Sequence, residues 1–94
     1  MKIMISQPMN GKTEKQIKEE REGLVRKLTE KGHEVLDTIF DFDCYASPIY
    51  YLAKSIEVLD KADAVVFMNG WENARGCIIE HEIAIKYHKF IKEL

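Results

Sequence analysis

Glu80 is the residue whose type and position most suggest chemistry. It falls in an expected helix over residues 77–88, and a projection at about 100° per residue places it in the middle of an otherwise apolar arc. That arc holds Cys77, Ile83, Ala84 and Tyr87. Burying an unpaired carboxylate is costly, so a glutamate there needs a partner or a task. Two interpretations stay open: Glu80 pairs with Arg75 or with loop N–H groups, or it acts as a nucleophile or general base.

Two loops are the other candidates for a site, because each combines glycine with polar side chains. The first spans residues 6–11 at the end of an expected strand over 2–6, and the second spans 69–76 after an expected strand over 62–68. In open parallel sheets, ligands bind beyond the carboxyl ends of the strands, at the switch point of the strand order. We therefore expect these two loops to lie side by side.

The elements that position these residues alternate between strand and helix. The expected strands cover 2–6, 33–37, 62–68 and 90–94, and the expected helices cover about 13–31, 47–61 and 77–88. Helix starts are marked by Thr13 with Gln16, which have capping-box spacing, and by Ser47 before Pro48. Such alternation predicts parallel pairing through right-handed crossovers. We expect one domain over residues 1–94: an α/β, three-layer flavodoxin/Rossmann-like fold with about four parallel strands in the order 2-1-3-4 and three helices.

Composition and charge exclude several classes of function. The chain has 94 residues and a formal net charge of −2, which argues against a nucleic-acid polymer as partner. No apolar run approaches the roughly 18 residues that span a bilayer, so we expect no membrane partner. The two cysteines form no CxxC pair, which fits a reducing, cytoplasmic location.

Several motifs favour neither a metal nor a cofactor. Gly11-Lys12-Thr13 ends like a phosphate-binding P-loop, but Ser6 replaces the leading glycine of that motif. The pair His81-Glu82 begins like a zincin, but the next histidine, His88, is not at the required i+4 position. Asp41 and Asp43 are interpreted as solvated loop charges rather than ligands for a sugar or a cation. We expect no metal and no cofactor.

Two more features of the same expected helix, Cys77 and a second apolar stripe, each have both a structural and a functional interpretation. At a helix start, the pKa of the Cys77 thiol could be lowered, although a small core residue is the favoured interpretation. Ile78 and Ile85 form the second stripe, with His81 and His88 beside them, and indicate a homo-oligomer formed partly through this helix. The alternative is scattered exposed isoleucine, which needs no explanation.

With these residues in view, the sequence resembles the nucleoside 2-deoxyribosyltransferase-like families. Within them it is similar to a small, phage-associated branch of unknown function, DUF4406. The resemblance covers almost the whole chain and is carried by three segments: KIMISQPMNGKT, ADAVVFMNGWENARGC and IEHEIA. In the transferases a nucleophilic glutamate stands in a Glu-x-Gly-x-Ala setting. Glu80 matches that glutamate and Ala84 matches the alanine, whereas Glu82 stands in place of the glycine.

The resemblance implies a nucleoside or nucleotide ligand and displacement at the anomeric carbon of its sugar, with Glu80 as the catalytic nucleophile. It departs from the family where an acidic residue is often found, at Ser55, and where Asp or Ser is common, at Ala74. The implied ligand-binding residues are Ser6, Gln7, Pro8, Met9, Asn10, Gly11, Ser55, Asn69, Gly70, Trp71, Arg75 and Gly76. Trp71 could stack on a base or cap the core.

Two classes of function remain open. The first is an enzyme that transfers or hydrolyses an N-glycosidic bond, and the second is a non-catalytic module that binds a nucleotide-type ligand in the same pocket. A purely structural dimeric domain would leave the two glycine-bearing loops unexplained. An enzyme needs a proton donor near Glu80, and Ser55, Tyr50, Tyr51 or a neighbouring subunit could supply it.

Overall fold

A computed structural model describes residues 1–37 and 47–94 of the chain. The interpretation of Asp41 and Asp43 as solvated loop charges lies outside the described residues.

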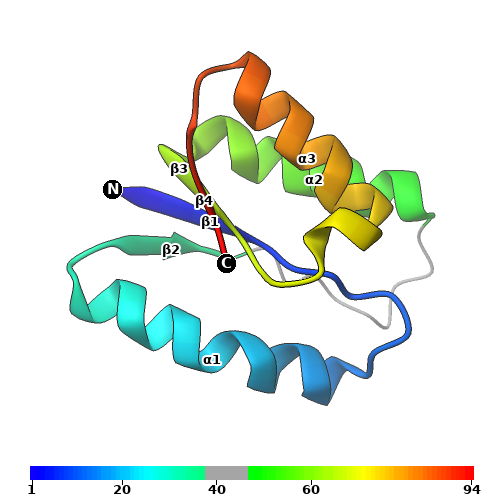
Figure 1. Ribbon diagram of the computed structural model, residues 1–94, viewed down its shortest axis with the longest axis horizontal. Helices are drawn as coiled ribbons and strands as arrows, with labels where there is room; N and C mark the ends of the chain where they lie inside the picture. Colours follow the sequence, from blue (N-terminus) through cyan, green and yellow to red (C-terminus); the bar gives the residue numbers. More distant parts are fainter. Residues whose placement is uncertain (38–46) are drawn as a thin grey trace.

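The strands form one parallel sheet in the order β2-β1-β3-β4. Figure 1 labels the strands and the three helices. The strands are β1 (Lys2–Ser6), β2 (Glu34–Leu36), β3 (Ala64–Phe67) and β4 (Phe90–Glu93). The helices are α1 (Glu14–Glu30), α2 (Pro48–Lys61) and α3 (Arg75–Lys86), with a short 3-10 turn, η1 (Trp71–Asn73), before α3. The expected α/β architecture and strand order are confirmed, and the fourth strand is present.

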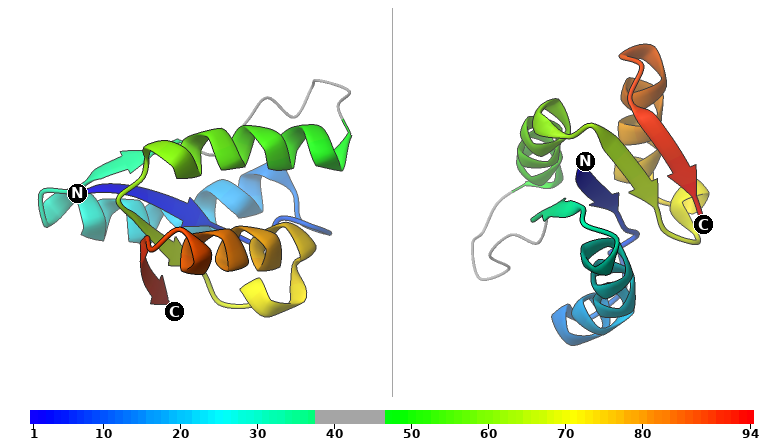
Figure 2. Two further views of the ribbon diagram at one scale, coloured as in Figure 1. Left: turned by 90° about the horizontal axis from the view of Figure 1, so that it is seen from above. Right: turned by 90° about the vertical axis from the view of Figure 1, so that its left-hand side faces the viewer.

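Two helices cover one face of the sheet and one covers the other. Figure 2 shows α1 on one side of the strands, with α2 and α3 together on the opposite side. Right-handed crossovers lie on opposite faces when the chain moves across the sheet in opposite directions, as it does from β1 to β2 and then from β2 through β3 to β4. The three expected layers are therefore present, and β1 and β3 lie at the centre of the sheet with their carboxyl ends at the same edge.

The helix starts follow from local sequence. The Thr13 side chain accepts a hydrogen bond from Gln16 N at 3.2 Å, and Gln16 Oε1 accepts one from Thr13 N at 2.9 Å, so the expected capping box is formed. Ser47 caps α2 by accepting from Tyr50 N at 3.2 Å, and Pro48 is the first helical residue. Gly32 follows the end of α1 with φ of +86°, a conformation that costs glycine little.

Helix α3 begins two residues earlier and ends two residues earlier than the spacing of apolar residues predicts. It covers Arg75–Lys86 rather than 77–88, and His88 turns the chain with φ of +59°. Tyr87, expected in the buried arc, is therefore beyond the last helical turn and is 73% exposed. Assigning Tyr87 to that arc was wrong, because the helical periodicity does not extend past Lys86.

The core between the sheet and the α2/α3 layer contains the largest buried side chains. Met4, Val65 and Phe67 point from the central strands into this layer, where they pack with Leu59, Ala62 and Ala84. Side chains alternate along a strand, so Ser6 points to the same layer as Met4. The alternation of side chains along β1 therefore places one polar residue, Ser6 at the carboxyl end of the strand, in the layer that contains α3.

Candidate functional site

The site is built around a hydrogen bond between β1 and α3. Ser6 Oγ donates to Glu80 Oε1 at 2.8 Å, and both residues are buried, with exposed fractions of 1% and 6%. Glu80 lies in the apolar face of α3 with Cys77 and Ala84, as the helical projection predicts. Glu80 is also the only buried carboxylate among residues 1–37 and 47–94.

Burial controls the charge of this carboxylate. Removal from water raises the pKa of Glu80 from its ordinary value of 4.5 to about 7, and the hydrogen bond from Ser6 opposes part of that rise. Near neutral pH the side chain therefore populates both the carboxylate and the acid. A carboxyl group with this pKa can serve as a nucleophile or exchange a proton at neutral pH.

Cys77 is a core residue whose burial disfavours the thiolate. It is 4% exposed, and burial raises its pKa to about 11, with a hydrogen bond to Ser6 opposing the rise and the nearby Glu80 adding to it. A thiol with a raised pKa carries little of the reactive thiolate at neutral pH. The favoured interpretation of Cys77 as a small buried residue is confirmed, and the alternative of a lowered pKa is wrong.

Arg75 is not the partner that stabilises Glu80. It is exposed in the first turn of α3, and no ion pair joins it to Glu80 in the part of the chain that the structure describes. Ser6 takes that role instead. From the sequence, Ser6 was predicted only as a possible ligand contact. Ser6 lies two residues after Met4 on β1, so both side chains point to the same layer, and this spacing was the signal that Ser6 shares a layer with Glu80.

The two glycine-bearing loops lie against each other, as the switch-point rule predicts. Met68 N donates to Ser6 O at 2.9 Å, at the start of both loops. Gly70 has φ of +91°, and a methyl group built on it would lie 3.7 Å from Pro8 Cγ. The second loop thus approaches the first at Gly70, where the backbone conformation favours glycine.

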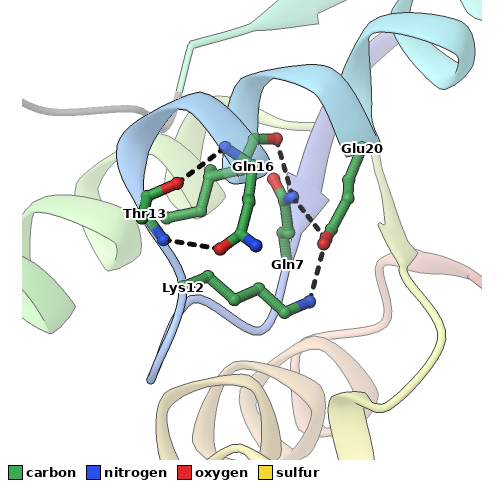
Figure 3. A network of polar contacts seen from close by, with 6 residues as sticks. Gln7, Lys12, Thr13, Gln16 and Glu20 are labelled. Carbon is green, nitrogen blue, oxygen red and sulfur yellow. Dashed lines mark hydrogen bonds and ion pairs between the residues drawn. The ribbon is translucent and has the colours of Figure 1, made fainter.

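Gln7 attaches the first loop to α1. Its Nε2 donates to Ile17 O at 2.9 Å and to Glu20 Oε2 at 3.4 Å, and Lys12 Nζ pairs with the same Glu20 oxygen at 2.8 Å (Figure 3). The hydrogen bond from Lys12 lowers the pKa of Glu20. Gln7 is 5% exposed, and its Oε1 accepts no hydrogen bond from the residues described. This network holds the backbone of residues 7–12 at the edge of the sheet.

Trp71 packs on neighbouring side chains of its own chain. Its ring stacks on His81 with centroids 4.1 Å apart and planes at 16°, and it lies against Phe67 at 5.4 Å. His81 Nε2 in turn contacts Glu93 Oε1 at 2.7 Å. Sequence reasoning did not anticipate this cluster, because it depends on the turn of η1. The geometry agrees with Trp71 as a cap on the core, and a role in stacking on a base stays a prediction.

The remaining predicted ligand-binding residues surround these loops at different depths. Met9 and Gly76 are half-buried, whereas Asn10, Gly11 and Asn69 are exposed. A methyl group built on Gly76 would touch Leu52 Cδ1 of α2 at 4.0 Å. Ser55 is half-buried and Tyr50 is 47% exposed on α2, and neither forms a hydrogen bond with Glu80. Ligand binding by all of these residues stays a prediction.

A cavity of about 260 Å³ lies on the other face of the sheet, between α1 and β2, away from Glu80. It is lined by Arg21, Val25, Val35, Leu36 and Asp37. Arg21 is 6% exposed and donates from Nη2 to Ile5 O at 3.4 Å. Burial lowers its pKa, and the nearby Asp37 opposes that effect. The position of Arg21, four residues after the buried Ile17 on α1, was the signal for its burial.

Two further features concern metals and membranes. Within the described ranges, no cluster of three or more histidine, cysteine, aspartate or glutamate side chains is arranged to hold a metal ion. A search of the same ranges for a helix that is long and apolar enough to cross a membrane finds none.

The fold and the site define a class of protein: a small three-layer α/β domain with a buried, hydrogen-bonded carboxylate beneath two loops at the sheet edge. Within that class, the model of the domain of unknown function DUF4406 matches residues 1–93, and the chain belongs to this family. No curated protein matches the sequence.

Proposed function

We propose that this domain binds a nucleoside or nucleotide at the sheet edge and transfers or hydrolyses its N-glycosidic bond, with Glu80 as the nucleophile. The observation that carries the proposal is the Ser6–Glu80 hydrogen bond, which holds a buried carboxylate at the start of the first loop. The resemblance to the nucleoside 2-deoxyribosyltransferase-like families supports the same residue.

The geometry leaves one carboxylate oxygen for a ligand. Ser6 donates to Oε1, and Oε2 accepts no hydrogen bond from any residue that the structure describes. In the proposed reaction Oε2 attacks C1′ of the sugar, the bond from C1′ to the base nitrogen breaks, and the base leaves with the electron pair and takes up a proton. Water or a second base then attacks C1′, and the glycosyl ester breaks to release the Glu80 carboxylate.

The raised pKa sets the conditions for this chemistry. Only the deprotonated carboxylate is nucleophilic, and the pKa of Glu80 is about 7. The rate of the first step should therefore rise as the pH increases through 7. A proton donor for the leaving base must come from Ser55, Tyr50, Tyr51 or a second copy of the chain, or from water.

A second candidate is a non-catalytic module that binds the same class of ligand. Glycoside cleavage usually employs a pair of carboxylates, and Glu80 has no buried acidic partner among the residues described. With a pKa of about 7, Glu80 would act as a hydrogen-bonding group to ribose hydroxyls, as an acceptor when charged and as a donor when protonated. No cofactor, metal or nucleic-acid polymer takes part in either proposal.

Turnover separates the two candidates. The protein is incubated with deoxynucleosides and deoxynucleotides, with and without an acceptor base, and free or exchanged base is followed by chromatography. Glu80→Ala is compared with Glu82→Ala, because Glu82 is an exposed glutamate on the same helix that pairs with Lys86 at 3.1 Å. Release that persists in Glu82→Ala and disappears in Glu80→Ala supports the enzyme.

Binding without turnover supports the second candidate. Binding of the same compounds is measured by calorimetry on the wild-type protein. A compound that binds, is not cleaved, and loses affinity in Glu80→Ala identifies a binding module. Absence of both binding and turnover for all nucleosides and nucleotides tested would reject the proposed ligand class.

A further inference from the structure

Strand β4 has an open edge that faces away from the rest of the sheet. It pairs in parallel with β3 through Phe90 N to Asp63 O at 3.2 Å and Leu94 N to Phe67 O at 2.9 Å. Backbone groups alternate in direction along a strand, so the N–H and C=O groups of Ile91 and Glu93 point outward. In the flavodoxin-type order 2-1-3-4-5, a fifth strand occupies this position. Among the described residues no strand does, and the right-hand view of Figure 2 shows β4 at one edge of the sheet.

Two copies of this edge strand have complementary charges when they run antiparallel to each other. In an antiparallel pair centred on Ile91, Ile91 lies opposite its own copy, and Lys89 of each strand lies opposite Glu93 of the other. Phe90, which is 66% exposed, then lies opposite Lys92. Lys89 Nζ already donates to Ala62 O at 2.7 Å and to Asp60 O at 3.3 Å, and Glu93 Oε1 contacts His81 Nε2 at 2.7 Å. The pair between the two strands would therefore use the third N–H of Lys89 and Glu93 Oε2. Opposite charges facing each other across two strands stabilise the pairing. Centring the pair on Lys92 or Glu93 instead places like charges opposite each other.

An apolar stripe on α3 lies on the same side of the molecule. Ile78 and Ile85 are 44% and 54% exposed, and His81 lies between them on the helix. The contact from His81 Nε2 to Glu93 Oε1 shows that this side of α3 is turned toward β4. Figure 2 likewise shows α3 next to β4. A partner that extends the sheet at β4 would therefore also cover this stripe.

We propose that β4 pairs antiparallel with β4 of a second copy of the chain, about a two-fold axis at Ile91, to form one continuous sheet across a homodimer. Ile91 of each copy exchanges both backbone hydrogen bonds with its counterpart, and Glu93 N–H donates to Lys89 C=O of the other strand. Lys89 N is already bonded to Ala84 O at 2.9 Å, so its N–H takes no part. The α3 helices then meet through Ile78 and Ile85. This proposal does not depend on the ligand or on catalysis.

A charge swap tests the register. Glu93→Lys places lysine opposite Lys89 in its own homodimer, and Lys89→Glu places glutamate opposite Glu93. Lys89→Glu also loses the hydrogen bonds from Lys89 Nζ to Asp60 O and Ala62 O, so circular dichroism first checks that both variants are folded. Each variant alone should self-associate at least about tenfold more weakly than the wild type, whereas an equimolar mixture should form a heterodimer with both charge pairs restored. Sedimentation equilibrium measures all three. Glu22→Lys on α1, which makes the same change of charge on the opposite layer, is the control and should dimerise like the wild type.

Hydrogen exchange provides a test that needs no variant. With increasing protein concentration, the amides of Ile91 and Glu93 should become protected, while those of Phe90, Lys92 and Leu94 are protected throughout. Sedimentation of the wild type as a monomer up to about 1 mM would overturn the proposal. So would a dimer in which the Ile91 and Glu93 amides exchange freely, or one in which the mixed variants show no preference for each other. Pairing of β4 with another protein while the wild type alone stays monomeric would equally overturn it.

Discussion

Ser6 at the end of β1 holds Glu80 in the middle of α3 through a 2.8 Å hydrogen bond between residues 74 positions apart in the sequence. The bond crosses from the sheet to the helix layer, and the hydroxyl that makes it also lies near the Cys77 thiol. Because the donor favours the charged form of the acceptor, Ser6 limits the rise in the pKa of Glu80 that burial causes. Ser6 thus acts on the site by setting both the position and the charge of the carboxylate.

Replacing Ser6 should make Glu80 harder to ionise. In Ser6→Ala the hydrogen bond is lost while the burial remains, so the pKa of Glu80 should rise further, by about one unit for a bond to a charged group. The measurement is an NMR titration of the Glu80 side-chain carboxyl carbon in both proteins. Thr29→Ala, which removes an exposed hydroxyl bonded to Val25 O on α1, is the control. An unchanged titration in Ser6→Ala would show that the hydroxyl has no influence on the charge of Glu80.

The buried carboxylate should make the protein less stable as the pH rises. The folded protein binds the Glu80 proton more tightly than the unfolded chain does, because the pKa is raised from 4.5 to about 7. The stability that this proton contributes is fully present below pH 4.5 and is lost as the pH rises through about 7. Glu80→Gln has no such proton, so at pH 8 it should be more stable than the wild type, by up to about 3 kcal/mol.

Urea unfolding at several pH values from 4 to 8 measures this difference. Other groups titrate equally in both proteins, so the difference in the free energy of unfolding isolates Glu80. Glu82→Gln on the exposed side of α3 serves as the control and should show no comparable trend with pH. A wild type that is as stable as Glu80→Gln at pH 8, with the same pH dependence, would contradict the raised pKa.

The Cys77 thiol should be unreactive in the folded protein. Burial raises its pKa to about 11, so little thiolate is present at neutral pH, and the side chain is 4% exposed. We expect iodoacetamide to modify Cys77 at least about tenfold more slowly in buffer than in urea. Mass spectrometry of the Cys44→Ser variant follows Cys77 alone. Equal rates in the folded and unfolded protein would mean that the thiol is accessible.

Much of the architecture follows from the sequence because its signals are local. The capping box at Thr13, the Ser47-Pro48 start and the apolar run before Met68 each depend on a few neighbouring residues, and the structure confirms all three elements. Parallel pairing follows from the alternation of strand and helix, whereas the order 2-1-3-4 was an analogy with flavodoxin that the structure confirms. The end of α3 was the exception. Tyr87 continued the apolar pattern beyond Lys86, the last helical residue, and His88 then takes a left-handed conformation.

The candidate site was only partly predictable for a physical reason. Helical periodicity gives the buried face of α3 and therefore Glu80, but it does not give the residue on another element that meets it. Arg75 was one possible partner because of its closeness in sequence and its charge, whereas the hydrogen bond comes from Ser6 across the layer boundary. The stack of Trp71 on His81 depends in the same way on the turn of η1, which no short pattern indicated.

The left-handed backbone conformation of Gly70 should make this position intolerant of a side chain. Its φ of +91° is unfavourable for alanine, whereas the added methyl group would lie at an ordinary contact distance of 3.7 Å from Pro8 Cγ. Gly70→Ala should therefore lower the free energy of unfolding by about 1–2 kcal/mol. Gly23→Ala is the matched control: Gly23 lies within α1 with nothing within 4 Å of an added methyl group, so the same change should stabilise the protein by about 0.5–1 kcal/mol. Urea unfolding of both variants gives the two signs. Equal effects in both would mean that the positive φ of Gly70 imposes no cost on alanine.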